Sequence, residues 1–304
     1  MKIAVVGTGG VGGYFGGLLA RVDQDVAFVA RGAHLRAMRA RGLRIESVDG
    51  PFTIAPLNAT DDPGEIGLVD LVMVCVKNYD LPAAIEQMRP LVGPETAILT
   101  LQNGVEAPDM LADVYGREKV LPGVVYCEVA VKEPGVIFQG SQIRRILFGE
   151  RDGTLSPRAR QIADMFAAAG AETILSDNIF GALWSKFCFI CGMSGVTTLT
   201  RQPVGPILAD EEARLLLRTV VAEAYAVARA SGVHFDADPV ETGMANFARF
   251  PHEARSSMQR DLDRGARLEV NALNGAVVRM GRALGIETPA NQAIFAALRL
   301  AVKE

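Results

Sequence analysis

The sequence is short of several residue types and patterns that mark particular classes of protein. It has only three histidines among 304 residues, and because they lie far apart, no histidine-based metal site is expected. It also lacks an excess of basic residues: 31 lysines and arginines stand against 35 acidic residues, a net charge of −4. That balance argues against a general nucleic-acid binder, although it leaves room for a small basic pocket that binds an anionic ligand.

Long apolar runs are lacking as well. The longest, 187–196, has about half of the roughly 18 residues that cross a bilayer, so no membrane partner is expected. The start of the chain, Lys2 followed by IAVVG, loosely resembles a signal peptide, but the glycines from Gly7 to Gly17 would make a poor apolar helix. We therefore expect a cytoplasmic protein.

The four cysteines are expected to be reduced in that compartment. Two of them, Cys188 and Cys191, form a CxxC pair. A zinc site would need a second pair or nearby histidines, and a thioredoxin-like motif would lie at the start of a helix after a strand, whereas this pair falls inside a helical pattern. We interpret the two cysteines as small buried residues.

The sequence does contain the composition of an ordinary globular protein, with 49% hydrophobic and 22% charged residues, and its length suggests two domains. In the first half, short β-branched runs alternate with helical patterns, which is typical of a parallel sheet with helices on both faces. We expect strands at 2–6, 25–30, 68–76 and 97–102, helices ending near residue 21 and over 32–41 and 81–91, and a hairpin over 43–57.

The pattern changes twice further along the chain. Three strands with Pro-Gly punctuation are expected between 119 and 149, followed by a helix over 156–169 and a strand over 171–175. After Ser176 only helical patterns follow, over 178–198, 210–232, 239–248, 257–265, 268–284 and 290–302. The sequence thus predicts an α/β N-terminal Rossmann-type dinucleotide-binding domain over 1–176, followed by an all-α C-terminal domain over 177–304.

The first expected strand is followed by a GxGxxG motif that opens a helix within a βαβ unit of the right length, a context typical of dinucleotide binding. Such glycines permit a tight turn, close approach of a pyrophosphate and close packing of helix on strand, while the helix N-terminus offers amides to the phosphates. The alternative is a glycine-rich turn without a ligand. The cofactor-binding residues expected in the motif are Gly7, Thr8, Gly9, Gly10, Val11 and Gly12.

The end of the second expected strand favours NADP over NAD. Chains that bind NAD usually carry an acidic residue there to hold the ribose 2′-hydroxyl, whereas this chain has Val29-Ala30-Arg31-Gly32. Arg31 can pair with a 2′-phosphate, unless it is an ordinary surface arginine. Lys77 and the Gln102-Asn103 pair follow two other strands, at the edge where open α/β sheets bind ligands, although each could be a loop residue or a helix cap.

Five segments together resemble one family. GTGGVGG at the start, CVKNYD and LQNG after two strands, LWSKF in the helical half and RSSMQRDLDRGARLEVNALNG near the end are similar, in this order, to the ketopantoate reductases (2-dehydropantoate 2-reductases). The resemblance covers residues 1–290 or so. It implies hydride transfer from NADPH to the C2 carbonyl of ketopantoate, giving pantoate in pantothenate biosynthesis, with the substrate-binding and catalytic domain over 177–304.

The resemblance also implies roles for single residues. Lys186 would be the general acid and Glu269 the second catalytic residue, while Lys77 and Asn103 would contact the cofactor. The implied substrate-binding residues are Asn103, Lys186, Ile190, Ser194, Ser257 and Glu269. Hydride addition puts negative charge on the carbonyl oxygen, which a lysine ammonium stabilises and then protonates. From residue type alone, Lys186 would be a surface lysine and Glu269 part of a solvated helix face.

One departure from the family pattern leaves the substrate open. The family places asparagines four and eight residues after its lysine, where this chain has Ile190 and Ser194. Ile190 cannot hydrogen-bond, and buried polar contacts discriminate strongly between substrates. Three hypotheses follow: a ketopantoate reductase, an NADPH-dependent reductase of a different and more apolar 2-oxo acid, and a non-enzymatic NADP-binding sensor. The retained Lys186 and Glu269 argue against the sensor, and a homodimer is compatible with all three.

Overall fold

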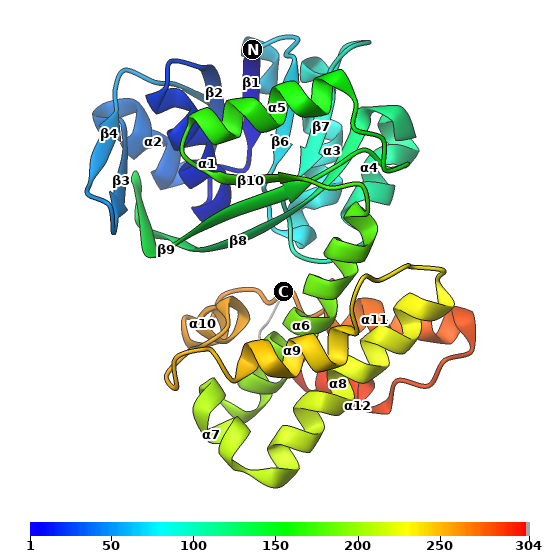
Figure 1. Cartoon of the computed structure of the whole chain (residues 1–304). Coiled ribbons are helices and arrows are strands. Elements are labelled where there is room, and N and C mark those ends of the chain that lie inside the picture. The colour runs from blue at the N-terminus through cyan, green and yellow to red at the C-terminus, as the bar shows by residue number, and fades with distance from the viewer. Residues whose placement is uncertain (302–304) are drawn as a thin grey trace. The chain divides into compact units, whose positions relative to one another are not determined.

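The computed structural model describes residues 1–301, which form two compact units (Figure 1). The first comprises Met1–Gln102 and Ala107–Ile179, and the second comprises Asn103–Glu106 together with the chain from Phe180 onward. The predicted fold class is confirmed, since the first unit is α/β and the second is helical. The sequence did not indicate that residues 103–106 belong with the helices.

The first unit is built on one ten-stranded sheet of order β4-β3-β9-β8-β7-β6-β1-β2-β5, in which β10 also pairs with β9. Strands β2, β1, β6 and β7 are parallel, as predicted, and so is β5, which was not predicted, whereas the β8–β9 and β3–β4 pairs are antiparallel. The strands are β1 (Lys2–Val6), β2 (Asp25–Val29), β3 (Leu43–Ser47), β4 (Phe52–Ile54), β5 (Asn58–Thr60), β6 (Leu71–Val74), β7 (Ala97–Thr100), β8 (Val120–Glu133), β9 (Val136–Phe148) and β10 (Glu172–Leu175).

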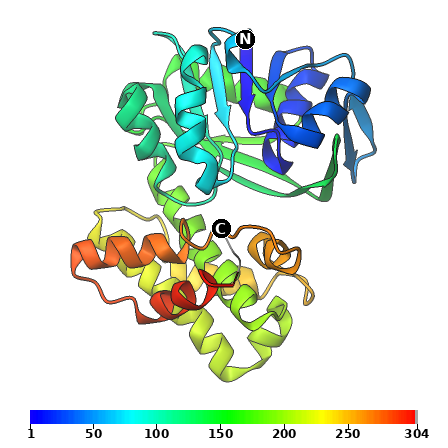
Figure 2. The ribbon, with the colours of Figure 1, turned by 180° about the vertical axis from the view of Figure 1, so that it is seen from behind.

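Helices cover both faces of the parallel strands. Figure 2 shows α3 (Leu81–Gln87) and α4 (Ala107–Tyr115) in front of them, where buried side chains of both helices join those of β1 and β6 in one apolar cluster. α4 was not predicted, and the helix predicted over 81–91 ends at Gln87 before a short 3₁₀ turn. α5 (Pro157–Ala168) crosses the opposite face (Figure 1), and α2 (Gly32–Arg41) follows β2.

α1 (Gly10–Arg21) carries glycine on two faces because strands pack against it from two sides. A Cβ at Gly16 would lie 2.8 Å from Val5 of β1, and a Cβ at Gly13 would lie 2.8 Å from Ile137 of β9. Both distances are too short for real Cβ atoms, because packed interiors leave no room for an added methyl group. The helix therefore lies between the parallel strands and the β8–β9 pair, which accounts for its glycines beyond the GxGxxG motif.

The three strands predicted over 119–149 are in fact two, β8 and β9. The Pro-Gly break before Val136 is a true turn, but Gly140 does not end a strand as the sequence pattern predicts. β9 is paired on either side of Gly140, with β8 and β3 up to Gln139 and with β8 and β10 from Arg144 onward, and Gly140 lies in the register shift between these two paired stretches. The glycine thus marks an irregularity within one long strand, as glycines in strands often do, and not the end of that strand.

The second unit consists of α6 (Ile179–Thr200), α7 (Val204–Ala209), α8 (Glu211–Ala230), α9 (Pro239–Phe247), α10 (Ser257–Asp263), α11 (Asn274–Leu284) and α12 (Pro289–Leu298). α7 was not predicted. The helix predicted over 268–284 is wrong in its first part, because 268–273 form an irregular segment with turns that leads into α11. The helix predicted over 290–302 ends at Leu298, and Val302 lies outside the described residues.

α6 corrects the expectation that no segment is long and apolar enough to cross a membrane. It has 22 residues, and an 18-residue window within it has a mean hydropathy of 1.5. Of that window, 67% is buried inside the protein, and Phe187, Cys188 and Val196 are fully inaccessible. Core helices of soluble proteins share this length and composition, and the burial of α6 matches that class.

A buried polar network ties four helices of the second unit together. The Asn274 amide of α11 donates to the Cys191 carbonyl of α6 at 3.2 Å and to Asn291 of α12 at 2.9 Å. The Glu223 carboxylate of α8 accepts from the Asn291 side chain at 2.8 Å and from the first free backbone amides of α12, those of Ala290 and Asn291, at 2.9 Å. Glu223 therefore caps α12 from another helix.

His34 of α2 gives the first unit a pH-dependent contact. It is half-buried, and its Nδ1 accepts a hydrogen bond from the Gly135 N–H at 3.0 Å. Burial lowers the pKa of this imidazole below its ordinary value of 6.5. Protonation of Nδ1 would also break the bond to the β8–β9 turn, since a protonated nitrogen cannot accept.

Stability is therefore expected to fall on mild acidification. Just below pH 6.5 the unfolded chain binds a proton at His34 that the folded chain does not, so the free energy of unfolding decreases as pH falls from about 6.5 toward the lower folded pKa. Urea unfolding of wild type and His34→Gln across pH 5–7.5 would measure this contribution. Parallel curves for the two proteins would contradict it.

Candidate active site

The glycines in the loop between β1 and α1 have two kinds of surroundings: Gly7 and Gly12 lie against other protein atoms, whereas Gly9 borders open space. Gly7 has φ +95°, and a Cβ there would lie 2.6 Å from the Val76 amide; a Cβ at Gly12 would overlap the Gly7 carbonyl. At Gly9, by contrast, nothing lies within 4 Å of an added Cβ. Protein contacts thus explain Gly7 and Gly12, and Gly9 borders space where a ligand can approach the backbone.

The N-terminus of α1, which directly follows this loop, suits an anion. Its N-cap is Gly9, which has no side chain to cap the helix, and its first turn has no acidic residue, so the positive end of the helix dipole is not compensated. Thr8 anchors the loop, because its N–H and its hydroxyl both donate to the Val29 carbonyl at the end of β2, at 3.2 and 3.0 Å. The loop is thereby held to Val29, two residues before Arg31.

Arg31 and Lys77 lie at the carboxyl ends of β2 and β6 respectively. The Arg31 guanidinium is 81% exposed and pairs with the Asp80 carboxylate at 2.7 Å. Asp80 is the last residue of the 3₁₀ turn Asn78–Asp80 (η2). Lys77 directly precedes this turn and is half-buried. The structure therefore brings one exposed guanidinium, held by one carboxylate, to the same edge of the sheet as the glycine-rich loop.

Gln102 follows β7 at this edge and is the most unusual polar residue there. Its side chain is 8% exposed, and neither its amide oxygen nor its amide nitrogen has a hydrogen-bond partner among the described residues. A buried amide without partners is unfavourable by about 1–3 kcal/mol, which a bound polar ligand would offset. The motif predicts Asn103 of this pair as the cofactor residue, whereas the orphaned amide of Gln102, which becomes visible only in the fold, marks Gln102 as a second candidate.

Lys186 and Asn103 are in direct contact. The Lys186 Nζ of α6 donates to the Asn103 Oδ1 at 2.9 Å, although 83 residues separate the two in the sequence. Both are half-buried, and both belong to the second unit. The structure thus joins the two predicted residues that come from different halves of the chain, and it holds an ammonium group at a fixed position.

The other predicted substrate residues lie in the second unit in different settings. Glu269 is 7% exposed and lies in the irregular segment before α11, so the alternative of a solvated helix face is wrong. Ile190 is half-buried and lies one helical turn after Lys186 along α6, and Ser194 is 5% exposed and lies two turns after it. Ser257 is the exposed first residue of α10, whereas its neighbour Ser256 is buried and caps that helix.

The cysteines do not form a chemical site. None of the four forms a disulfide, and burial raises the pKa of the Cys188 thiol to about 12 and that of Cys191 well above its ordinary value. Thiols so far from ionisation are poor nucleophiles and poor metal ligands. Within residues 1–301 no group of three or more histidine, cysteine and acidic side chains could hold a metal ion.

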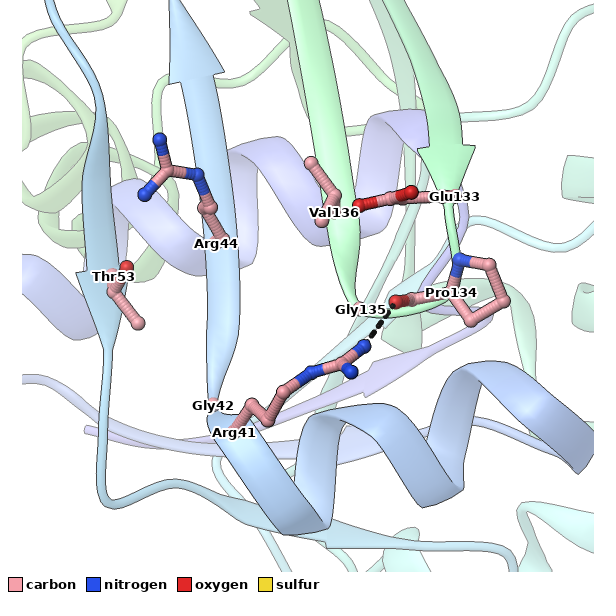
Figure 3. Close-up of a pocket in the computed structure, with 8 residues that line it drawn as sticks. All are labelled: Arg41, Gly42, Arg44, Thr53, Glu133, Pro134, Gly135 and Val136. Atoms are coloured by element: carbon pink, nitrogen blue, oxygen red, sulfur yellow. Dashed lines mark hydrogen bonds between the residues drawn. The ribbon is translucent and has the colours of Figure 1, made fainter.

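A pocket of the first unit lies away from these residues (Figure 3). It has a volume of about 460 Å³ between β3, β4 and the β8–β9 turn, where Arg41 donates to the Pro134 carbonyl at 3.3 Å. None of the predicted site residues lines it. Arg44, which borders the pocket, pairs with Glu46 at 3.3 Å, so part of its positive charge is already neutralised.

Comparison with known proteins identifies the family of this chain. A family model described as ketopantoate reductase PanE/ApbA matches residues 3–153, and the model of its C-terminal part matches residues 178–302. The chain belongs to the ketopantoate reductase family. Ketopantoate reductases are oxidoreductases that interconvert a carbonyl and a CH–OH group.

Individual family members match over the whole chain. The 2-dehydropantoate 2-reductase of Mesorhizobium japonicum is 34% identical over 98% of this chain and 97% of that protein. A Bacillus subtilis protein described as uncharacterized oxidoreductase YkpB is 33% identical over 99% of this chain and 98% of that protein. The crystal structure of a PanE/ApbA family ketopantoate reductase from Ralstonia eutropha is 36% identical, with a TM-score of 0.91 over 99% of this chain and 98% of that one.

Structures of less similar sequence share the fold. D-mandelate dehydrogenase, solved with NADH and anilino(oxo)acetate, has a TM-score of 0.91 at 22% identity, covering 99% of this chain and 98% of that chain. The dimeric ketopantoate reductase of Staphylococcus aureus has a TM-score of 0.84 at 24% identity with the same coverage. The same architecture thus occurs in proteins described as acting on different substrates.

Proposed function

We propose that the protein is an NADPH-dependent 2-dehydropantoate 2-reductase, which reduces the C2 carbonyl of ketopantoate to give pantoate in pantothenate biosynthesis. The observation that carries the proposal is the hydrogen bond from Lys186 Nζ to Asn103 Oδ1 at 2.9 Å. It holds the predicted general acid at one place in a chain that belongs to this family. Buried Glu269 supplies the second predicted catalytic group.

The residues at the edge of the sheet fit a dinucleotide. Gly9 and the uncompensated N-terminus of α1 would receive the pyrophosphate, Arg31 a 2′-phosphate, and the orphaned amide of Gln102 the polar atoms near the nicotinamide. Lys77 adds a cation at the same edge. When bound, NADPH supplies the hydride.

The chain's own residues then act on the substrate oxygen. The Lys186 ammonium stabilises negative charge on that oxygen and donates a proton to it. Asn103 accepts one N–H of the ammonium and so directs the others. Glu269, held in the segment before α11, would orient the lysine or bind a substrate hydroxyl.

The test is NADPH oxidation followed by absorbance with a panel of 2-oxo acids. Oxidation with ketopantoate supports the proposal, and oxidation only with other acids supports a reductase of another 2-oxo acid. That second candidate rests on Ile190, which puts an apolar side chain one turn from Lys186 where the family has an amide. Binding of NADPH without turnover of any acid would contradict both.

Ile190→Asn is expected to shift the substrate preference. A restored amide on the Lys186 face of α6 can hydrogen-bond a polar substrate, so the ratio of kcat/KM for ketopantoate to that for an apolar acid such as 2-oxoisocaproate should rise roughly tenfold or more. Ile190→Leu is the matched control, because it keeps the size without the hydrogen bond. An unchanged ratio in Ile190→Asn would remove Ile190 from the substrate site.

Arg31→Ala is expected to weaken NADPH binding about tenfold, the effect of losing one charge-assisted contact in an exposed setting, and to leave NADH binding nearly unchanged. Asp80→Asn removes the carboxylate that competes for the same guanidinium, so it should leave NADPH binding equal or tighter. Fluorescence titration with both cofactors would measure these effects. Equal losses for NADPH and NADH in Arg31→Ala would contradict the assignment.

We also propose that the enzyme works in the cytoplasm as a homodimer. Support for the dimer comes from the Staphylococcus aureus reductase, which is described as dimeric. Light scattering on the purified protein would test it: a mass near 65 kDa supports a dimer, and a mass near the 32.5 kDa of one chain rules it out.

A further inference from the structure

The two segments that carry Asn103 and Glu269 are both irregular. Asn103–Glu106 is a bend with Gly104 at φ +100°, and 269–273 form turns before α11. Neither segment has the regular backbone hydrogen bonds that fix the residues of a helix or strand. The positions of Asn103 and Glu269 therefore depend on the side-chain contacts that hold these segments.

One guanidinium holds both segments. Arg279 lies on α11, and its two terminal nitrogens bond in different directions. One donates to the Asn271 carbonyl at 3.0 Å and to the Asn271 Oδ1 at 2.7 Å, and the other donates to the Glu106 Oε2 at 2.7 Å. All of these residues belong to the second unit.

Each contact lies a few residues from a predicted site residue. Glu106 is three residues after Asn103 in the bend that Lys186 reaches at its other end. Asn271 lies in the turn whose amides, those of Ala272 and Leu273, donate to the Glu269 carbonyl at 3.0 and 3.1 Å. Arg279 is thus the shared anchor of the two segments.

We propose that Arg279 is a positioning residue, whose guanidinium fixes the 103–106 bend and the 269–273 turn relative to each other and so sets Asn103 and Glu269 about Lys186. This inference rests on the proposed function, in which those three residues meet the substrate. The planar fork of arginine suits the task, because it makes several hydrogen bonds at fixed angles. No sequence motif indicated it, since Arg279 and Glu106 are 173 residues apart.

The ion pair between Arg279 and Glu106 is expected to fix the positions of the two segments more than it stabilises the fold. The side chains of Arg279 and Glu106 are 44% and 34% exposed, and exposed ion pairs contribute only about 0–1 kcal/mol to folding. A misplacement of about 1 Å in an active site can lower a rate ~10²-fold. The loss of Arg279 should therefore reduce turnover far more than it reduces stability.

The test compares Arg279→Met with Arg282→Met, since Arg282 lies one turn further along α11 and is exposed. Arg279→Met should lower kcat ~10–100-fold, with NADPH affinity and the melting temperature close to wild type, and Arg279→Lys, which can reach one partner, should recover part of the loss. Hydrogen exchange should show faster amide exchange in 103–106 and 269–273 in Arg279→Met alone. Arg282→Met should match wild type in both measurements.

Glu106 provides an independent arm. Glu106→Gln keeps an acceptor oxygen and should lose less activity than Glu106→Ala, and the Glu106→Ala, Arg279→Met double variant should lose less than the product of the two single losses. If the wild type is active and the Arg279 and Glu106 variants have the same kcat as wild type, the positioning role alone is overturned. A wild type that turns over no 2-oxo acid would remove the proposed function, and the positioning role with it.

Discussion

Replacing Lys186 with alanine is expected to lower kcat by a factor of ~10²–10⁴, the usual contribution of a positioned proton donor. Hydride addition to a carbonyl places negative charge on its oxygen, and Lys186 carries the ammonium that the Asn103 amide holds at 2.9 Å. Without it the oxygen must take its proton from water, which is neither oriented nor positively charged.

The effect should be confined to the chemical step. The residues proposed to hold the dinucleotide, Gly9, Arg31 and Gln102, belong to the first unit, so the dissociation constant of NADPH should change little in Lys186→Ala. Lys132→Ala is the matched control, because Lys132 is an exposed lysine paired with Glu46 at 2.7 Å. Steady-state kinetics with the best 2-oxo acid and fluorescence titration of NADPH would measure both quantities.

Near-wild-type kcat in Lys186→Ala would end this mechanism. Glu269→Ala should also lower activity, with a larger share of its effect in KM if the carboxylate holds a substrate hydroxyl. The two substitutions should be non-additive in the double variant if lysine and glutamate act as a unit. Strict additivity would indicate that Glu269 acts apart from Lys186.

The first half of the fold could be predicted from the sequence because each of its signals is local. A strand such as β6 is buried on both faces, so it reads as a continuous apolar run, and the GxGxxG motif is recognised within one βαβ unit, although the backbone that leaves no room for a Cβ at Gly7 belongs to Val76, after β6. The antiparallel β8–β9 pair was harder, because the two strands pair on either side of an irregularity at Gly140, which locally predicts a break.

The candidate site was predictable only where residue type and motif agree. Lys186 and Asn103 follow from the family resemblance, and the structure shows that they touch. The position of Glu269 was not predictable, because 268–273 have helical composition but form turns anchored by Arg279 from the following helix. Long-range side-chain anchors of this kind leave no periodic trace in a sequence.

The buried polar network was missed for the same reason. Asn274 and Asn291 each fall within apolar helical patterns, where one amide has no periodic signal, and Glu223 lies 68 residues from its partner. A glycine marks the network indirectly, because a Cβ at Gly195 of α6 would lie 2.8 Å from the Asn274 amide nitrogen. Only the packed structure shows that these positions belong together.

Glu223→Ala is expected to lower the free energy of unfolding of the helical unit by roughly 2–4 kcal/mol. The substitution removes a 9% exposed carboxylate that accepts from Ala290, from Asn291 and from the Asn291 side chain. Each buried donor left without a partner is unfavourable by about 1–3 kcal/mol, and partial access of water to the start of α12 reduces the sum.

Urea unfolding followed by helical circular dichroism would measure the loss, and hydrogen exchange should show that α12 opens first. Glu212→Ala is the matched control: Glu212 is exposed in the first turn of the same helix, so its removal should cost no more than about 1 kcal/mol of helix-dipole interaction. Glu223→Gln separates charge from hydrogen bonding, because its amide oxygen can still accept from α12. Similar losses in Glu223→Ala and Glu212→Ala would show that Glu223 does not hold α12 in place.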